Sequence, residues 1–203
     1  MKTALSDTEI EILKLLTSDL TRDFTILKIA ELTGKAKRLT YAAAKKLAKE
    51  RTIIIQEKAN LKLCKLNLRN AQIIAFIESL RWREFSRRHP DIGLLVSTII
   101  SKSDLPYLTV AVFGSYAKET ATEKSDLDML VVIPDRIFAN AVEAAIESAK
   151  VLSNVPLHDV IVTYAEFVDM LKEMRITVAR EVLEARYVAY GAEPFYTLIG
   201  RLL

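Results

Sequence analysis

Residues 113–133 constrain the fold of this chain more than any other stretch. A hydrophobic strand predicted over residues 107–113 runs into Gly114-Ser115. Ten residues after Ser115, the run Ser125-Asp126-Leu127-Asp128 leads directly into a second apolar run. Because side chains alternate along a strand, two carboxylates separated by one residue point to the same face. The stretch therefore predicts a glycine turn beside an acidic pair, and such a pair suits a divalent metal.

Charge is unevenly distributed along the 203 residues. Residues 1–70 contain 15 Lys and Arg against 8 Asp and Glu, whereas residues 71–203 contain 14 against 18. The basic part suits a polyanionic partner and the acidic part suits a metal, although a charged helix face is most often simply solvated.

The composition excludes several classes of protein. No apolar run is long enough to cross a bilayer, and acidic residues stand where a signal peptide has its apolar segment, so we expect a cytoplasmic protein with no membrane partner. A single cysteine, Cys64, excludes an internal disulfide.

The first 70 residues change from a helical to an extended pattern. Apolar spacing predicts helices near residues 8–16, 25–34 and 35–50, the last with Leu39, Ala43 and Leu47 on its inner face. Strands are predicted at residues 52–56 and 61–68, with a polar turn at 57–60 between them.

Three helices followed by a hairpin, with Gly34 between the second and third helices, resemble the winged helix-turn-helix family of DNA-binding domains. The resemblance implies that residues 36–50 enter the major groove. The DNA contacts that it implies are Lys37, Arg38, Thr40, Tyr41, Lys45 and, at the hairpin tip, Lys58. Alanines 42–44 offer little for base readout, so binding dominated by phosphates is expected. The alternative is a protein-docking or dimerisation module.

The rest of the chain predicts an α/β fold of the α+β type. A long apolar helix at residues 70–89 connects a domain at 1–69 to a domain at 70–203, and it could also pack on a second copy in a homodimer. Helices are expected at 91–103, after Asp135, and at 166–173 and 177–189, with a third strand at 158–163. These elements predict a small mixed sheet.

A second resemblance rests on Gly114-Ser115, Ala117, Lys118 and the run Ser125-Asp126-Leu127-Asp128. They resemble the signature of the DNA polymerase beta-like nucleotidyltransferase superfamily, most closely its minimal, antitoxin-type members. The likeness continues in the HDVIVTYAEF segment and in residues 188–191.

This resemblance implies a nucleotide site and a metal site. Backbone N–H groups at a glycine turn can cradle phosphates, and two Mg²⁺ ions about 4 Å apart can assist phosphoryl chemistry. The implied nucleotide-binding residues are Gly114, Ser115, Lys118 and Ser125. The implied catalytic residues are Asp126 and Asp128 as metal ligands and Asp159 either as a third ligand or as the base toward the acceptor hydroxyl. One position departs from the pattern: Glu119 stands where the minimal members have a second glycine, and its negative charge is expected to slow transfer or alter the loop.

Two functions follow from these resemblances. In the first, a Mg²⁺-dependent nucleotidyltransferase moves AMP from ATP to an acceptor hydroxyl, by resemblance one on a partner toxin, while the winged helix binds DNA. In the second, a DNA-binding regulator senses nucleotide without efficient transfer. Small-molecule modification of the kind that inactivates antibiotics would leave the basic domain unexplained.

Overall fold

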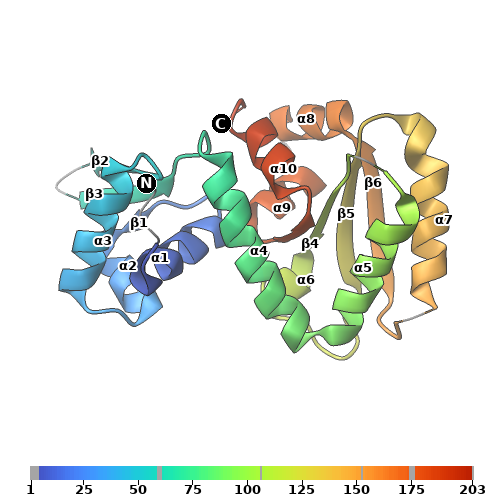
Figure 1. Cartoon of the computed structure of the whole chain (residues 1–203), viewed down its shortest axis with the longest axis horizontal. Helices are drawn as coiled ribbons and strands as arrows, with labels where there is room; N and C mark the ends of the chain where they lie inside the picture. The colour runs from blue at the N-terminus through green and yellow to red at the C-terminus, as the bar shows by residue number, and fades with distance from the viewer. Residues whose placement is uncertain (1–4, 59–60, 106, 152, 174–176, 203) are drawn as a thin grey trace.

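The computed structural model describes residues 5–58, 61–105, 107–151, 153–173 and 177–202. Two groups of elements lie on either side of a long helix, α4 (Ala71–Arg88) (Figure 1). Within the described residues, no helix combines the length and the apolar character needed to cross a membrane.

The N-terminal group contains three helices and a small antiparallel sheet in the order β1-β3-β2. Its elements are α1 (Asp7–Ser18), β1 (Phe24–Thr25), α2 (Ile26–Thr33), α3 (Lys37–Lys49), β2 (Ile53–Lys58) and β3 (Leu61–Leu66). A capping box between Ser6 and Glu9 starts α1, and Gly34, with φ +64°, ends α2. The predicted turn at 57–60 lies partly outside the described residues, because residues 59 and 60 are not among them.

The inner face of α3 differs from the expected one. Thr40, Ala43, Ala44 and Leu47 are buried, whereas Leu39 is 57% exposed. The Thr40 hydroxyl donates to the Ala36 carbonyl at 3.2 Å, inside the domain. An α-helix has about 3.6 residues per turn, so its buried face follows a mixed spacing of three and four, as in positions 40, 43, 44 and 47, and not a strict spacing of four. The inward placement of Leu39 and the DNA contact of Thr40 are therefore both wrong.

The C-terminal group is built on a four-stranded sheet with the order β6-β5-β4-β7. Strands β4 (Thr109–Phe113) and β5 (Leu127–Ile133) are antiparallel, β6 (Leu157–Thr163) is parallel to β5, and β7 (Tyr187–Tyr190) is antiparallel to β4. The predicted mixed sheet is confirmed. Its helical elements are α5 (Pro90–Ser103), α6 (Gly114–Ala117), the 3₁₀ helix η1 (Arg136–Phe138), α7 (Ala139–Lys150), α8 (Tyr164–Lys172), α9 (Val178–Glu184) and α10 (Ala192–Ile199).

The helix expected at residues 177–189 is shorter than predicted. It ends at Glu184, and residues 187–190 form β7, an edge strand hydrogen-bonded to β4. The spacing of apolar residues here is compatible with a helix, but β4 without β7 has an unpaired edge. Residues 187–190 form a strand because pairing with β4 satisfies the backbone hydrogen bonds of both strands.

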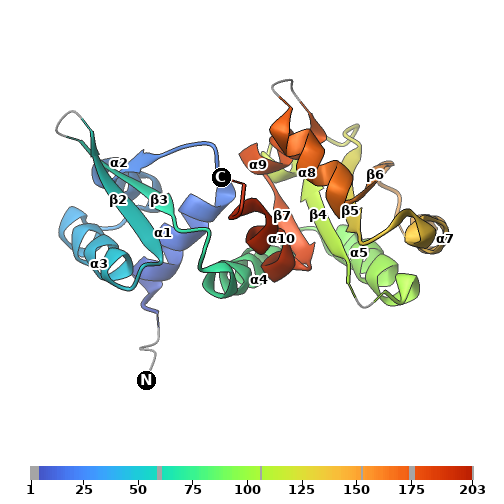
Figure 2. The same ribbon diagram turned by 90° about the horizontal axis from the view of Figure 1, so that it is seen from above.

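The sheet is buried on both faces. Figure 2 shows α8 and α9 on one face and α5 and α7 on the other. On the first face, Leu130 and Val132 belong to a hydrophobic core that continues through Ile74 and Ile77 of α4 to Leu13 of α1. One core thus crosses the predicted boundary between residues 69 and 70.

A buried polar network reinforces this junction. The Tyr196 hydroxyl donates to Glu78 and accepts from Arg186 Nη2 at 2.6 Å. The same Arg186 nitrogen donates to the Thr17 carbonyl of α1 at 2.8 Å, and Arg81 Nη1 pairs with Glu78 Oε2 at 2.9 Å. The side chains of Glu78 and Arg186 are fully buried, so these bonds fix α1, α4 and α10 relative to one another.

Candidate active site

Gly114 and Asp128 meet where β4 ends and β5 begins. The antiparallel register pairs Phe113 with Asp128, which brings the glycine turn against the carboxylate. Gly114 has φ +66°, and a Cβ at this position would lie 2.0 Å from Asp128 Oδ2. A side chain here would occupy the space of the carboxylate, so this turn requires glycine.

The other residues of the signature lie around this contact. Asp126 is exposed and precedes β5 by one residue, so the alternation of side chains would direct it to the same face as Asp128. Ser115 is half-buried in α6. The Ser125 hydroxyl accepts from the Thr122 N–H at 2.9 Å and so closes the 122–125 turn. Lys118 Nζ lies 3.7 Å from Glu184 of α9, on the surface.

Asp159 does not join the other two carboxylates. In the parallel ladder it is paired with Met129, whereas Asp128 is paired with His158. Paired residues point to the same face, so Asp159 points to the face opposite Asp128. There its Oδ1 lies 3.5 Å from Lys150 Nζ at the end of α7. The structure therefore contradicts Asp159 as a third ligand beside Asp126 and Asp128.

His158 occupies the place expected for that third side chain. Its Nδ1 lies 3.0 Å from Asp128 Oδ1. Within the parts of the chain that the structure describes, no three His, Cys, Asp or Glu side chains form a group able to hold a metal ion. The carboxylate oxygens of Asp126 and Asp128 nevertheless suit a hard cation that takes its remaining ligands from substrate phosphates. Glycine at position 114 leaves to the Asp128 carboxylate the space that a Cβ would fill.

Glu119 adopts the conformation for which glycine is the usual residue. Its φ is +57°, in the left-handed region. Its Oε1 accepts from Arg88 Nη1 at 2.8 Å and from the Tyr187 hydroxyl at 3.2 Å, and the Arg88 guanidinium lowers the pKa of the Glu119 carboxyl. This carboxylate, predicted from the sequence to disturb the phosphates, is thus engaged by α4 and β7.

The residues predicted to contact DNA lie on the surface of the N-terminal group, except for the buried Thr40. Lys37 and Arg38 begin α3, and Lys58 ends β2. The Lys45 ammonium lies 4.8 Å from the Tyr41 ring centroid, and Lys62 Nζ of β3 approaches the Tyr41 hydroxyl to 3.4 Å. Lys62 and Lys45 together lower the Tyr41 pKa. Local sequence does not indicate Lys62, because only the fold brings β3 to α3.

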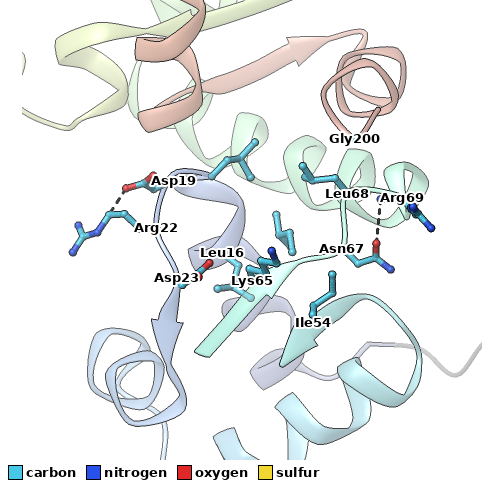
Figure 3. A pocket seen from close by; sticks show the side chains of 12 residues that line it. Leu16, Asp19, Arg22, Asp23, Ile54, Lys65, Asn67, Leu68, Arg69 and Gly200 are labelled. Carbon is cyan, nitrogen blue, oxygen red and sulfur yellow. Dashed lines mark hydrogen bonds and ion pairs between the residues drawn. The ribbon is translucent and has the colours of Figure 1, made fainter. Parts of the chain in front are cut away.

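A cavity of about 550 Å³ lies apart from the acidic pair. Figure 3 shows the residues that line it, which come from α1 and the segment after it, from β2 and β3, from the segment between β3 and α4, and from Gly200 after α10. Arg22, Lys65 and Arg69 line it together with Asp19 and Asp23, so its charges are mixed. No residue of the glycine turn or the acidic pair borders it.

Comparison with known proteins identifies one segment. Residues 97–183 match the family model described as a nucleotidyltransferase domain. The matched segment begins in α5, ends in α9 and contains the glycine turn together with Asp126, Asp128 and Asp159. Searches of curated proteins and of solved structures find no match to the chain.

Proposed function

We propose that this chain transfers a nucleoside monophosphate, AMP from ATP, to an acceptor hydroxyl. The observation that carries the proposal is the Asp128 carboxylate lying against the Gly114 turn, inside the segment that matches a nucleotidyltransferase domain. In the reaction, the acceptor oxygen bonds to the α-phosphorus, the bond from that phosphorus to the bridging oxygen breaks, pyrophosphate leaves, and the hydroxyl proton passes to water.

Each residue of the turn and the pair has a role in this proposal. The backbone of Gly114 and Ser115 holds the triphosphate, and Asp126 and Asp128 hold two Mg²⁺ ions, which when bound offset phosphate charge and activate the acceptor. Lys118, on the same loop, is a candidate phosphate contact, whereas the Ser125 hydroxyl acts by holding the turn before Asp126. Asp159 has no catalytic role in this scheme.

Transfer is tested with α-labelled ATP, Mg²⁺ and candidate acceptors. Wild type is expected to move label onto an acceptor, and Asp126→Ala and Asp128→Ala are expected to abolish it. Asp159→Asn is the matched control, because it alters a carboxylate on the neighbouring strand that faces away from the pair. Loss of transfer in Asp159→Asn alone would contradict this assignment.

We further propose that the N-terminal group is a winged helix that binds DNA mainly through phosphates. Its support is the exposed basic surface formed by Lys37, Arg38, Tyr41, Lys45, Lys58 and Lys62. Lys45→Ala and Lys62→Ala should each weaken binding and reduce the slope of log K against log salt by about 1. Lys102→Ala, an exposed lysine of α5, should leave both quantities unchanged.

A second candidate function is favoured by two observations: Asp159 faces away from the pair, and contacts connect the nucleotide loop to α1. Glu119 bonds to Tyr187, the Tyr187 ring lies 4.8 Å from the Arg81 guanidinium, and Arg81 Nη1 lies 3.5 Å from the Thr17 carbonyl. These contacts support a regulator whose DNA affinity responds to nucleotide. Its signature is a change of DNA affinity with Mg·ATP while no pyrophosphate is released.

The proposals also name the partners that this chain would have. A protein hydroxyl, of Tyr, Ser or Thr on a toxin, is the acceptor that the antitoxin resemblance supports. A homodimer on two DNA half-sites is consistent with the proposed winged helix, and sedimentation of the full chain with and without DNA tests it.

A further inference from the structure

The Asp128 carboxylate is held from two sides. Its Oδ2 fills the space that a Gly114 side chain would take, and its Oδ1 lies 3.0 Å from His158 Nδ1. A carboxylate can only accept a hydrogen bond, so this contact requires the proton on Nδ1 of the imidazole. The hydrogen bond with His158 thus orients a carboxylate that lies against the glycine turn.

The origin of this contact is the strand register. His158 and Asp128 are partners in the parallel β5–β6 ladder, so the imidazole is delivered by the neighbouring strand onto the same face. The side chain of His158 is 63% exposed, against 27% for Asp128. An imidazole that is so exposed contributes little to the core, and its visible contact is with the carboxylate.

We propose that His158 is a positioning residue that orients the Asp128 carboxylate toward a divalent cation. The inference rests on the proposed function, because it assigns to Asp128 a cation to hold. Hydrogen bonds to a ligating carboxylate fix its orientation, and removing such partners typically lowers metal affinity about 10-fold to 100-fold. In this chain β6 thus supplies a hydrogen-bond donor to Asp128 where a third carboxylate was expected.

The chain offers substitutions that separate orientation from direct ligation. The amide nitrogen of Asn can reach the place of the His Nδ1, because both atoms are attached to the carbon that follows Cβ. The amide of Gln extends one bond further and reaches toward the place of Nε2. A positioning role therefore predicts that His158→Asn preserves the affinity for the divalent cation and that His158→Gln does not.

The experiment measures Mn²⁺ binding to the full chain by the loss of the free-ion electron paramagnetic resonance signal, with and without a non-hydrolysable ATP analogue. His158→Ala and His158→Gln should bind Mn²⁺ about 10-fold to 100-fold more weakly than wild type. His158→Asn and Asp159→Asn should bind it like wild type. Asp128→Ala should lose binding altogether.

The outcomes distinguish this inference from the proposed function. Wild-type affinity in His158→Ala, with loss of binding in Asp128→Ala, would overturn the role of His158 and leave the metal site standing. Rescue by Gln in place of Asn would overturn it in favour of direct ligation through Nε2. Failure of the wild type to bind Mn²⁺, even with the nucleotide analogue, would overturn both proposals.

Discussion

The contact between Gly114 and Asp128 makes a quantitative prediction for Gly114→Ala. A non-glycine residue at φ +66° is expected to cost about 1–2 kcal/mol. The new Cβ would also stand 2.0 Å from Asp128 Oδ2 and 3.1 Å from Asp128 Cβ, so the aspartate must leave its rotamer, which costs about 0.5–1.5 kcal/mol. Together these two effects predict a loss of about 1.5–3.5 kcal/mol in the free energy of unfolding.

Two comparisons separate the backbone effect from the clash. Gly34 has φ +64°, and a Cβ added there would meet nothing within 4 Å, so Gly34→Ala should show the backbone effect alone, about 1–2 kcal/mol. In an Asp128→Ala background, Gly114→Ala should fall to a similar value, because the carboxylate is no longer there. The expected coupling between positions 114 and 128 is about 1 kcal/mol.

The assay is urea unfolding of the four proteins of the double-mutant cycle and of Gly34→Ala, monitored by far-ultraviolet circular dichroism. A cost of Gly114→Ala that is the same with and without the Asp128 carboxylate would refute the reasoning, because it would show that the two groups do not meet. A cost of Gly34→Ala equal to that of Gly114→Ala would refute it as well.

The remaining predictions concern Glu119, Tyr196 and Cys64. Glu119→Gly relieves the strain of a left-handed conformation and loses only an exposed ion pair, so its free energy of unfolding in urea should match or exceed that of wild type. Glu119→Ala keeps the strain, so its free energy of unfolding should be about 1 kcal/mol below that of Glu119→Gly. Because Arg88 lowers the Glu119 pKa below the ordinary 4.5, the stabilisation from this pair is present above pH 4.5 and lost as the pH falls through the lowered value; Glu119→Gln should show a shallower acid decline in unfolding free energy. Tyr196→Phe, which leaves Glu78 and Arg186 buried without their shared hydroxyl, should cost about 1–3 kcal/mol, whereas Tyr190→Phe at the surface should cost almost nothing by the same measurement. Burial, with a smaller contribution from Asp23, raises the pKa of the Cys64 thiol to about 11, so a thiol reagent at pH 8 should label Cys64 only after unfolding.

The order of elements could be predicted because it depends on local pattern. Helical spacing in the first 50 residues, the strands on either side of Gly114 and Asp128, and the mixed sheet all appear in the structure. The glycine turn and the acidic pair could be paired from sequence as well, because both flank strands that are close along the chain. The segment at residues 187–190 could not, since its strand exists only through pairing with β4.

The face on which a carboxylate lies could not be read from β6. Residues 160–162 of this strand are apolar on both faces, so alternation does not reveal which face the polar residues His158 and Asp159 each take. Only the register with β5 decides which of these side chains lies beside Asp128. In the observed register it is His158, and a shift of one residue would place Asp159 there instead.

The sequence by itself determined that a glycine turn and two aspartates stand at the ends of adjacent strands, because glycine conformation and strand alternation are local properties. Tertiary structure alone decided three other matters: which residue of β6 meets Asp128, how Glu119 is held by Arg88 and Tyr187, and how Arg186 ties α1 to α10. The contacts of His158 with Asp128, of Arg88 with Glu119 and of Arg186 with Thr17 each join residues at least 30 positions apart in the sequence. Strand register and packing around α4 bring these residues together.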